Sequence, residues 1–171
     1  MELSFCKAGE GDAVALANLV NAAYRGDASR KGWTTEADLL EGSRTDVDEV
    51  LALMTAADSL FLLCKTGAQL LGSVHLQLTE EGVHLGMLAV QPSHQGQNIG
   101  KALLSAAEHA ARHMGAADCI VMEVITCRHE LIAFYQRLGY QSTGVIRPFP
   151  LDPAFWKVAD LQLVVLAKSL V

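Results

Sequence analysis

The chain has 171 residues, about the usual size of one domain, and its 51% of hydrophobic residues can fill a core and exclude intrinsic disorder. Its 13 basic and 19 acidic residues give a formal charge of −6, which argues against a general affinity for nucleic acid or anionic lipid. We therefore expect a single domain over residues 1–171 that has no nucleic-acid partner.

The hydrophobic segments are too short for a membrane helix, which needs about 20 apolar residues. Residues 1–7 also lack the basic and apolar regions of a secretory signal. These features predict a cytoplasmic protein without a membrane partner.

The cysteines and histidines show no metal-binding pattern. Cys6, Cys64, Cys119 and Cys127 form no C-x-x-C pair, and we expect reduced, mostly buried thiols. His109 and His113 lie one helical turn apart but lack a third ligand nearby, so we expect no metal.

The predicted elements of the first half begin with a strand at residues 3–7. A helix capped by Asp12 follows, and it should end near Arg25 and Gly26. Its expected apolar face is formed by Val14, Leu16, Leu19, Val20 and Ala23. After a polar segment at 26–32, Thr34 or Thr35 can cap a second helix through residue 40, and Asp46 can cap a helix at 47–57, so two or three helices come before the next strand.

The second half predicts three strands at 60–65, 70–78 and 83–90, joined by short polar turns typical of antiparallel hairpins. A helix at 99–114, a strand at 119–124 and a helix at 131–138 follow. The last strands are expected at 140–146 and 160–167, with a loop at 148–153 between them. The order β-αα-βββ-α-β-α-ββ predicts an α/β protein with a mixed sheet flanked by helices.

The most informative segment runs from a strand through a loop into a helix, over residues 88–104. Gly96, Asn98 and Gly100 tolerate a left-handed or crowded backbone, so the loop can present N–H groups where the helix dipole favours an anion. The spacing differs from a nucleoside-triphosphate loop, because three residues separate the two glycines and Ala102 follows Lys101. The dinucleotide-binding pattern G-x-G-x-x-G is also absent.

Residues 95–100, Gln-Gly-Gln-Asn-Ile-Gly, resemble motif A of the GNAT family of N-acetyltransferases, Q/R-x-x-G-x-G/A, with Asn98 in place of the central glycine. A later family motif has an Asn, a helix ending in Tyr and a Gly-aromatic pair, and this sequence has Arg128, Tyr135 and Gly139-Tyr140. The predicted element order is also that of the family. The resemblance implies a GNAT-like acyl-CoA N-acyltransferase fold and transfer of acetyl from acetyl-CoA to a primary amine of a small molecule or peptide.

The resemblance also assigns the cofactor contacts. In the family, the fourth strand splays from the fifth and its free backbone groups pair with the pantetheine arm, while the pyrophosphate lies at the start of the next helix. The residues assigned to acetyl-CoA are Leu88, Ala89, Val90, Gln95, Gly96, Gln97, Asn98, Gly100, Lys101, Arg128 and Tyr135.

For catalysis, the resemblance places Tyr135 as the general acid that protonates the leaving thiolate. The general base remains open between His84, which lies on the strand leading to motif A, and Glu123, which interrupts a buried strand. A water chain to either residue would also serve.

The acceptor site in this family lies after the first helix and near the loop between the last strands. Here these regions hold Tyr24, Trp33, Glu36 and Arg147, with Arg25, Thr34, Arg44, Phe149 and Phe155 nearby. Their arginines could hold an amine that has its own carboxylate, such as an amino acid or a peptide terminus. A packed tryptophan among exposed surface charges explains these residues equally well.

Two other functions remain open at this stage. The domain could bind acyl-CoA without turnover, against which Tyr135 argues, or it could be a regulatory nucleotide-binding domain, for which the phosphate motifs are missing. A homodimer is also plausible, although no residue pattern indicates which face would pair.

Overall fold

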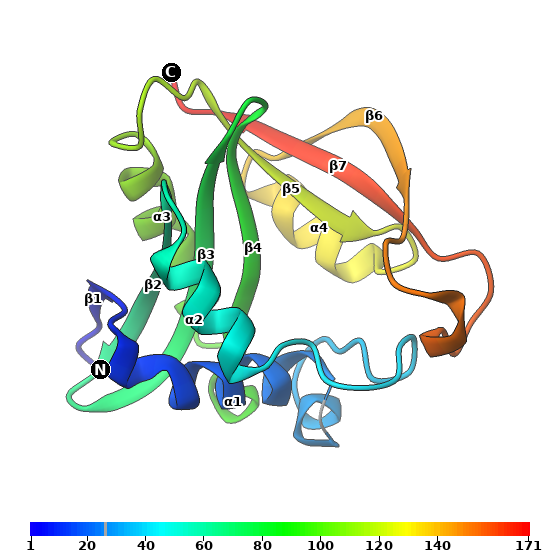
Figure 1. The fold of residues 1–171 in the computed structure, drawn as a ribbon, viewed down its shortest axis with the longest axis horizontal. Coiled ribbons are helices and arrows are strands. Elements are labelled where there is room, and N and C mark those ends of the chain that lie inside the picture. The colour runs from blue at the N-terminus through cyan, green and yellow to red at the C-terminus, as the bar shows by residue number, and fades with distance from the viewer. Residues whose placement is uncertain (26) are drawn as a thin grey trace.

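The computed structural model describes residues 1–25 and 27–171, and these form a mixed sheet with helices on both faces (Figure 1). The seven strands of the sheet have the order β1-β2-β3-β4-β5-β7-β6. They are β1 (Ser4–Lys7), β2 (Ser59–Thr66), β3 (Gln69–Thr79), β4 (Gly82–Val90), β5 (Cys119–Ile125), β6 (Gln141–Pro148) and β7 (Gln162–Ser169). The α-helices are α1 (Ala13–Tyr24), α2 (Val47–Thr55), α3 (Ile99–Ala111) and α4 (His129–Arg137). The predicted fold class and element order are confirmed.

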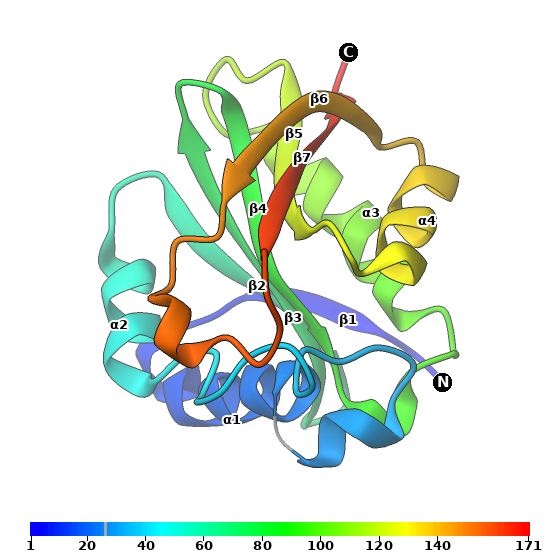
Figure 2. The same cartoon turned by 90° about the vertical axis from the view of Figure 1, so that its right-hand side faces the viewer.

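The two sheet faces carry two separate cores, which follow the alternation of side chains along a strand. On β2, Phe61 and Leu63 pack with α1 and α2, while Leu62 and Cys64 face the core that contains α3 and α4. The sheet therefore lies between an α1/α2 layer and an α3/α4 layer (Figures 1 and 2).

Helix α1 begins where predicted, but two details of the prediction are wrong. Val14 is 60% exposed, because Ala13 and Ala17 rather than Val14 complete the buried face with Leu16. Asp12 makes no side-chain cap to the helix, since its carboxylate accepts from the backbone N–H of Gly9 instead. The predicted end near Arg25 and Gly26 is confirmed by Arg25, which is the C-cap of α1, whereas Gly26 lies outside the described residues.

The prediction of a helix at 34–40 is also wrong. The Thr35 hydroxyl donates to the Tyr24 carbonyl and accepts from the backbone N–H of Ala37, so it closes a local turn rather than capping a helix. Leu40 then forms an isolated antiparallel bridge with Trp156, so the segment lies beside the loop between β6 and β7 (Figure 2). In contrast, Asp46 caps α2 as predicted by accepting from the N–H of Glu49 at 2.7 Å.

All four cysteines are free thiols, but the expectation that they are mostly buried is wrong. Only Cys64 is fully buried; Cys119 is half-buried, and Cys6 and Cys127 are exposed. Cys6 lies on the edge strand β1 and Cys127 in the turn after β5. Both positions are at the margin of the sheet, so these thiols are not covered by a core.

Two expectations about the whole chain can be compared with the described residues. No helix among them is both long and apolar enough to cross a membrane. Within residues 1–25 and 27–171, no group of three or more His, Cys, Asp or Glu side chains is arranged to hold a metal ion. The rings of His109 and His113 pack against each other, and His113 Nδ1 is hydrogen-bonded to the His109 carbonyl.

Candidate active site

The site begins where the sheet divides. Strands β4 and β5 run parallel but pair only at Val83 with Ile120 and at His84 with Val121. Beyond these pairs the two strands diverge (Figure 1), so the backbone groups of residues 86–90 on that edge of β4 are left without a strand partner. Unpaired backbone groups need other hydrogen-bond partners, and an amide-rich ligand can supply them.

A β-bulge in β4 decides which side chains face this opening. Gly86 lies opposite His75 but Ala89 lies opposite Ser73, so β4 has one residue more than β3 over this stretch. The extra residue is Met87, which has a positive φ of 49°. The bulge shifts the alternation of side chains by one residue. Leu85 faces the α3/α4 core, but Met87, two residues later, faces α1, and Leu88 faces the α3/α4 core instead.

The loop after β4 has the predicted backbone shape. Gly96 and Asn98 have φ values of 81° and 64°, and Asn98 is the N-cap of α3 without any side-chain cap bond. The first N–H groups of α3 therefore point out of the helix end without an intrahelical acceptor, beside the side chain of Lys101. This is the geometry of an anion site.

Gln95 holds this loop in place through its side chain. Its amide nitrogen donates to the Val90 carbonyl at 3.2 Å, and its amide oxygen accepts from the backbone N–H of Trp33. The residue was predicted to contact the cofactor through its backbone, and the structure adds this tie between the loop and the segment after α1.

A cavity of about 510 Å³ joins the diverging strand to this loop. The residues assigned to acetyl-CoA from the sequence line it, apart from Gln97, which is exposed outside the lining. Trp33 was expected on the acceptor side, but it lines this cavity and packs against Phe134, with ring centroids 5.6 Å apart. Sequence reasoning missed the α4 contribution of Leu131, Phe134, Arg137 and Leu138, although their spacing along one helix face would have revealed it.

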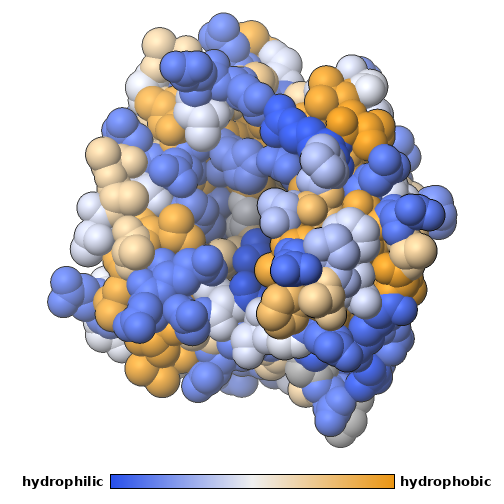
Figure 3. Space-filling model, turned by 45° about the vertical axis from the view of Figure 1, so that its right-hand side comes forward, coloured by the Kyte–Doolittle hydropathy of each residue, from blue (hydrophilic) through white to orange (hydrophobic). Residues whose placement is uncertain are grey.

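A second cavity, of about 490 Å³, lies on the other side of the opening. Its lining includes Tyr24, Glu36, His84 and Glu123 from the predicted set, but not Arg147. Five residues line both cavities: Tyr24, Leu88, Arg128, Leu131 and Tyr135. Figure 3 shows a hollow near the centre of this face, with mostly hydrophilic residues around it.

Tyr135 is therefore positioned at the junction of the two cavities. Its side chain packs edge-on against Tyr140 and Phe134, and the residue is 5% exposed. Burial raises the pKa of the Tyr135 phenol far above its usual value of 10.0, with a smaller contribution from Tyr24. The phenol is therefore in its neutral, protonated form at neutral pH.

The two base candidates lie next to each other. His84 Nε2 is 3.3 Å from Glu123 Oε1, and the same oxygen accepts from Arg147 at 3.2 Å. Arg147 also pairs with Glu81 at 2.6 Å, so its guanidinium is shared between two carboxylates. Among the described residues both contacts to Glu123 end on Oε1, which leaves Oε2 for a water or an amine.

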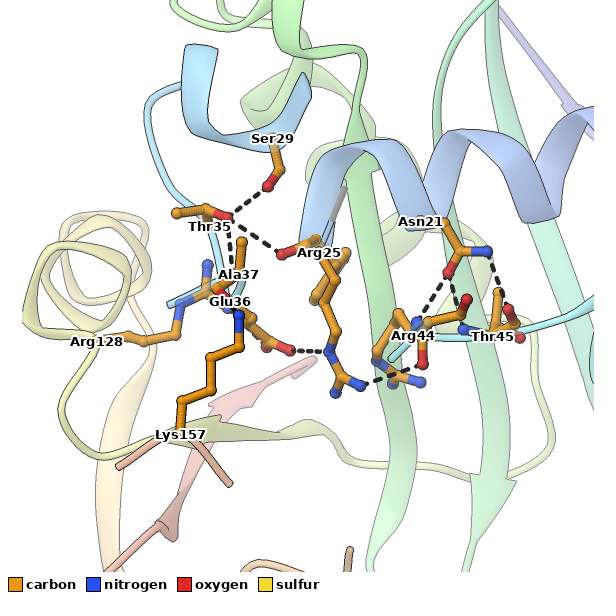
Figure 4. Close-up of polar contacts among 12 residues, drawn as sticks. Asn21, Arg25, Ser29, Thr35, Glu36, Ala37, Arg44, Thr45, Arg128 and Lys157 are labelled. Carbon is orange, nitrogen blue, oxygen red and sulfur yellow. Dashed lines mark hydrogen bonds and ion pairs between the residues drawn. The ribbon is translucent and has the colours of Figure 1, made fainter. Parts of the chain in front are cut away.

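A buried ion cluster links the segment after α1 to α4 (Figure 4). The Glu36 carboxylate accepts from Arg25 at 3.2 Å and from Arg128 at 2.8 Å, and Arg128 also donates to the Thr34 hydroxyl at 2.7 Å. Glu36 and Arg128 are 7% and 5% exposed. Glu36, predicted to contact the acceptor, and Arg128, predicted to contact the cofactor, thus bind each other. Their ion pair holds the boundary between the two cavities in place.

The residues present fit acetyl-CoA. Open backbone on β4 suits the amides of pantetheine, and the left-handed positions at Gly96 and Asn98 leave space before α3 for a pyrophosphate. A methyl group added at Gly96 would meet no atom within 4 Å, which shows that the space beside the loop is open. Lys101 and Arg137 add positive charge to the same cavity in a chain whose overall charge is negative.

Comparison with known proteins agrees with this geometry. A model of the acetyltransferase (GNAT) family matches residues 15–140. The chain belongs to the GNAT family. Among curated relatives, human N-acetyltransferase 8B is 27% identical over 123 residues, which cover 68% of this chain and 53% of the relative. The rat N-acetyltransferase 8B is 30% identical over 115 residues, covering 64% of this chain and 50% of the relative. The chain thus spans about half the length of the curated relatives it matches.

Solved GNAT structures share the fold along nearly the whole chain. The ribosomal-protein-S18-alanine N-acetyltransferase of Escherichia coli superposes with a TM-score of 0.71 at 16% identity, covering 99% of this chain and 94% of that one. The Salmonella typhimurium protein yncA, solved with its cofactor acetyl-CoA, has the same TM-score at 21% identity and the same coverage. At these sequence identities the similarity shows a shared fold and does not indicate a shared substrate.

Proposed function

We propose that this GNAT protein is an acetyl-CoA-dependent N-acetyltransferase that transfers acetyl directly to a primary amine of a small molecule or peptide. The observation that carries the proposal is the meeting of the two cavities at Tyr135, beside the unpaired edge of β4. One cavity suits the cofactor, the other suits an acceptor, and a protonated phenol lies between them. The whole of residues 1–171 would act as one domain around this site.

Acetyl-CoA supplies an activated acetyl group as a thioester. The amine nitrogen forms a bond to the acetyl carbon and the carbon–sulfur bond breaks, so one proton must leave the nitrogen and one must reach the sulfur. Tyr135 is placed to give its phenolic proton to the thiolate, because it is buried at the junction and neutral at physiological pH.

The proton from the amine is assigned to the pair of Glu123 and His84. Glu123 Oε2 receives it, either directly or through a water, while His84 and Arg147 hold Oε1 and fix the carboxylate in the second cavity. After product release, solvent exchange restores the protonated phenol and the ionised carboxylate.

The proposal is tested by incubating the protein with acetyl-CoA and a panel of primary amines, and measuring both free CoA thiol and acetylated product by mass spectrometry. The expected result is amine-dependent thiol release with an equal amount of N-acetylated product. Binding of acetyl-CoA without turnover of any amine would instead support a non-catalytic acyl-CoA-binding domain.

A further inference from the structure

The second cavity contains three arginine side chains that differ in what they bind. Arg25 pairs with Glu36 and also donates to the Ser43 carbonyl at 3.2 Å. Arg128 pairs with the same carboxylate and with Thr34. Both guanidinium groups are therefore engaged in holding the protein together.

Arg44 is different. Its backbone N–H donates to the Asn21 side chain at 2.8 Å, which fixes the position of the Arg44 backbone (Figure 4). Its guanidinium lies over the Tyr24 ring, 5.6 Å from the centroid, and within the part of the chain that the structure describes it has neither a carboxylate nor a carbonyl partner. A half-buried guanidinium that lines a cavity in this way can bind an anion with two hydrogen bonds.

The charges around Arg44 favour such an anion. Glu36 is one carboxylate between two arginines, so the cluster of Arg25, Glu36 and Arg128 keeps a net positive charge, and Arg44 adds to it. Glu49 of α2 also lines the cavity and accepts from the Thr45 hydroxyl at 2.6 Å, and with its charge included three arginines still face two carboxylates. This wall of the cavity is therefore positive.

The opposite charge comes from another element. Glu123 lies on β5 in the same cavity and has one oxygen free for an amine. The lining of the same cavity also includes Met87, Leu88 and Phe149, which are apolar. A molecule that carries an amine, a carboxylate and an apolar side chain would match all three parts of the surface.

We propose that the acceptor is an amine that also has a carboxylate, as a free amino acid does, and that Arg44 binds this carboxylate. The inference rests on the proposed acetyl transfer and narrows its substrate class. Arg44 then determines specificity, while Glu123 receives the proton that the same molecule's neutral amine nitrogen loses when it bonds to the acetyl carbon.

The test compares free amino acids with their carboxamides as acceptors, with leucine and phenylalanine against leucinamide and phenylalaninamide as the first pairs. Steady-state kinetics are measured for the wild type, for Arg44→Gln and for Arg30→Gln, a control arginine on the surface paired with Asp27 and Asp38. Binding of acetyl-CoA to each protein is measured separately by calorimetry.

We expect the free acids to be preferred over the amides by kcat/KM. Arg44→Gln should raise KM for the acids by about 10- to 100-fold, because a hydrogen-bonded charge is lost, and leave KM for acetyl-CoA and the rate with amides unchanged. Arg30→Gln should behave as wild type.

Equal use of acids and amides, or an equal loss with both in Arg44→Gln, would overturn the carboxylate inference and leave acetyl transfer standing. Acetyl-CoA binding with no acetylation of any acid would also overturn it. A protein that neither binds acetyl-CoA nor acetylates any amine would contradict the proposed function itself.

Discussion

At the scale of single residues, Tyr135 is the proposed proton donor to the leaving thiolate. Replacing it by Phe keeps the ring packing against Phe134 and Tyr140 but removes the phenolic proton. We expect kcat in Tyr135→Phe to fall about 100-fold, with the dissociation constant for acetyl-CoA nearly unchanged. Stopped-assay turnover and calorimetry measure the two quantities.

The control for this variant is Tyr140→Phe. Tyr140 belongs to the same core and touches Tyr135, but it lines neither cavity. It should therefore keep its turnover. If both variants turned over like wild type, Tyr135 would not be the acid.

The second residue-scale prediction concerns the base. Glu123→Gln keeps the size of the side chain and can still accept from Arg147, but it cannot take up a proton near neutral pH. We expect kcat/KM to fall at least about 100-fold, whereas His84→Gln should have a smaller effect. Unchanged pH–rate profiles in both variants would remove both residues from the mechanism.

At the scale of elements, the order of strands and helices was predictable because hairpin turns, helix periodicity and the Asp46 cap are local signals. The failure at 34–40 has a local cause too: a threonine that can cap a helix can also close a turn, and the bridge from Leu40 to Trp156 selects the turn. No local signal marks the bulge at Met87, since it depends on pairing with β3.

The candidate site was predictable only in part, for a similar reason. The loop at 95–100 has a residue pattern that shows its shape, so Gly96 and Asn98 were found with their left-handed backbone. Trp33 lines the first cavity rather than the second, which no local signal indicates, because its position depends on Gln95, 62 positions away along the chain. The cluster of Glu36 and Arg128 joins residues even farther apart, and neither shows alone that it has a buried partner.

The element-scale prediction is that this cluster fastens the segment after α1 to α4. In Arg128→Met, the Thr34 hydroxyl and the Glu36 Oε2 each lose a charged hydrogen-bond donor, although Thr34 keeps Glu130 and Glu36 keeps Arg25, so we expect the free energy of unfolding to fall by about 3 kcal/mol. Denaturant titration measures the change. Arg30→Met removes the exposed ion pairs with Asp27 and Asp38 and should cost less than about 1 kcal/mol.

A loss in Arg128→Met no larger than that in Arg30→Met would contradict the role of the cluster. The double variant Glu36→Gln with Arg128→Met adds a further check, because coupled residues should lose less together than the two single variants lose in sum.

At the scale of the whole molecule, the stability of the fold should depend on pH through His75. This residue lies in β3 with its Nε2 2.7 Å from the Ser59 hydroxyl. Burial, with smaller contributions from the charges of His84 and Arg44, lowers the pKa of His75 from 6.5 to about 4. Between these values the unfolded chain binds a proton that the folded protein does not, so stability is complete above about pH 6.5 and falls toward pH 4.

The expected loss is up to about 3 kcal/mol over this range, measured by denaturant unfolding at a series of pH values. His75→Gln should show a shallower fall than wild type, whereas His113→Gln, an exposed histidine after α3, should follow wild type. Parallel curves for all three proteins would show that His75 does not set the acid limit.

The central claim is that the cavity between β4, the loop at 95–100 and α4 binds acetyl-CoA. Calorimetric titration with acetyl-CoA tests it most directly, with ATP and 3′,5′-ADP as competing anions and with Gly96→Val and Gly67→Val as matched variants. Both glycines have positive φ and open space around them, but only Gly96 lies at the cavity. We expect saturable binding of acetyl-CoA and no binding of ATP. The affinity for acetyl-CoA should fall at least about 10-fold in Gly96→Val and stay unchanged in Gly67→Val. No binding of acetyl-CoA, or equal binding in wild type and Gly96→Val, would contradict the claim.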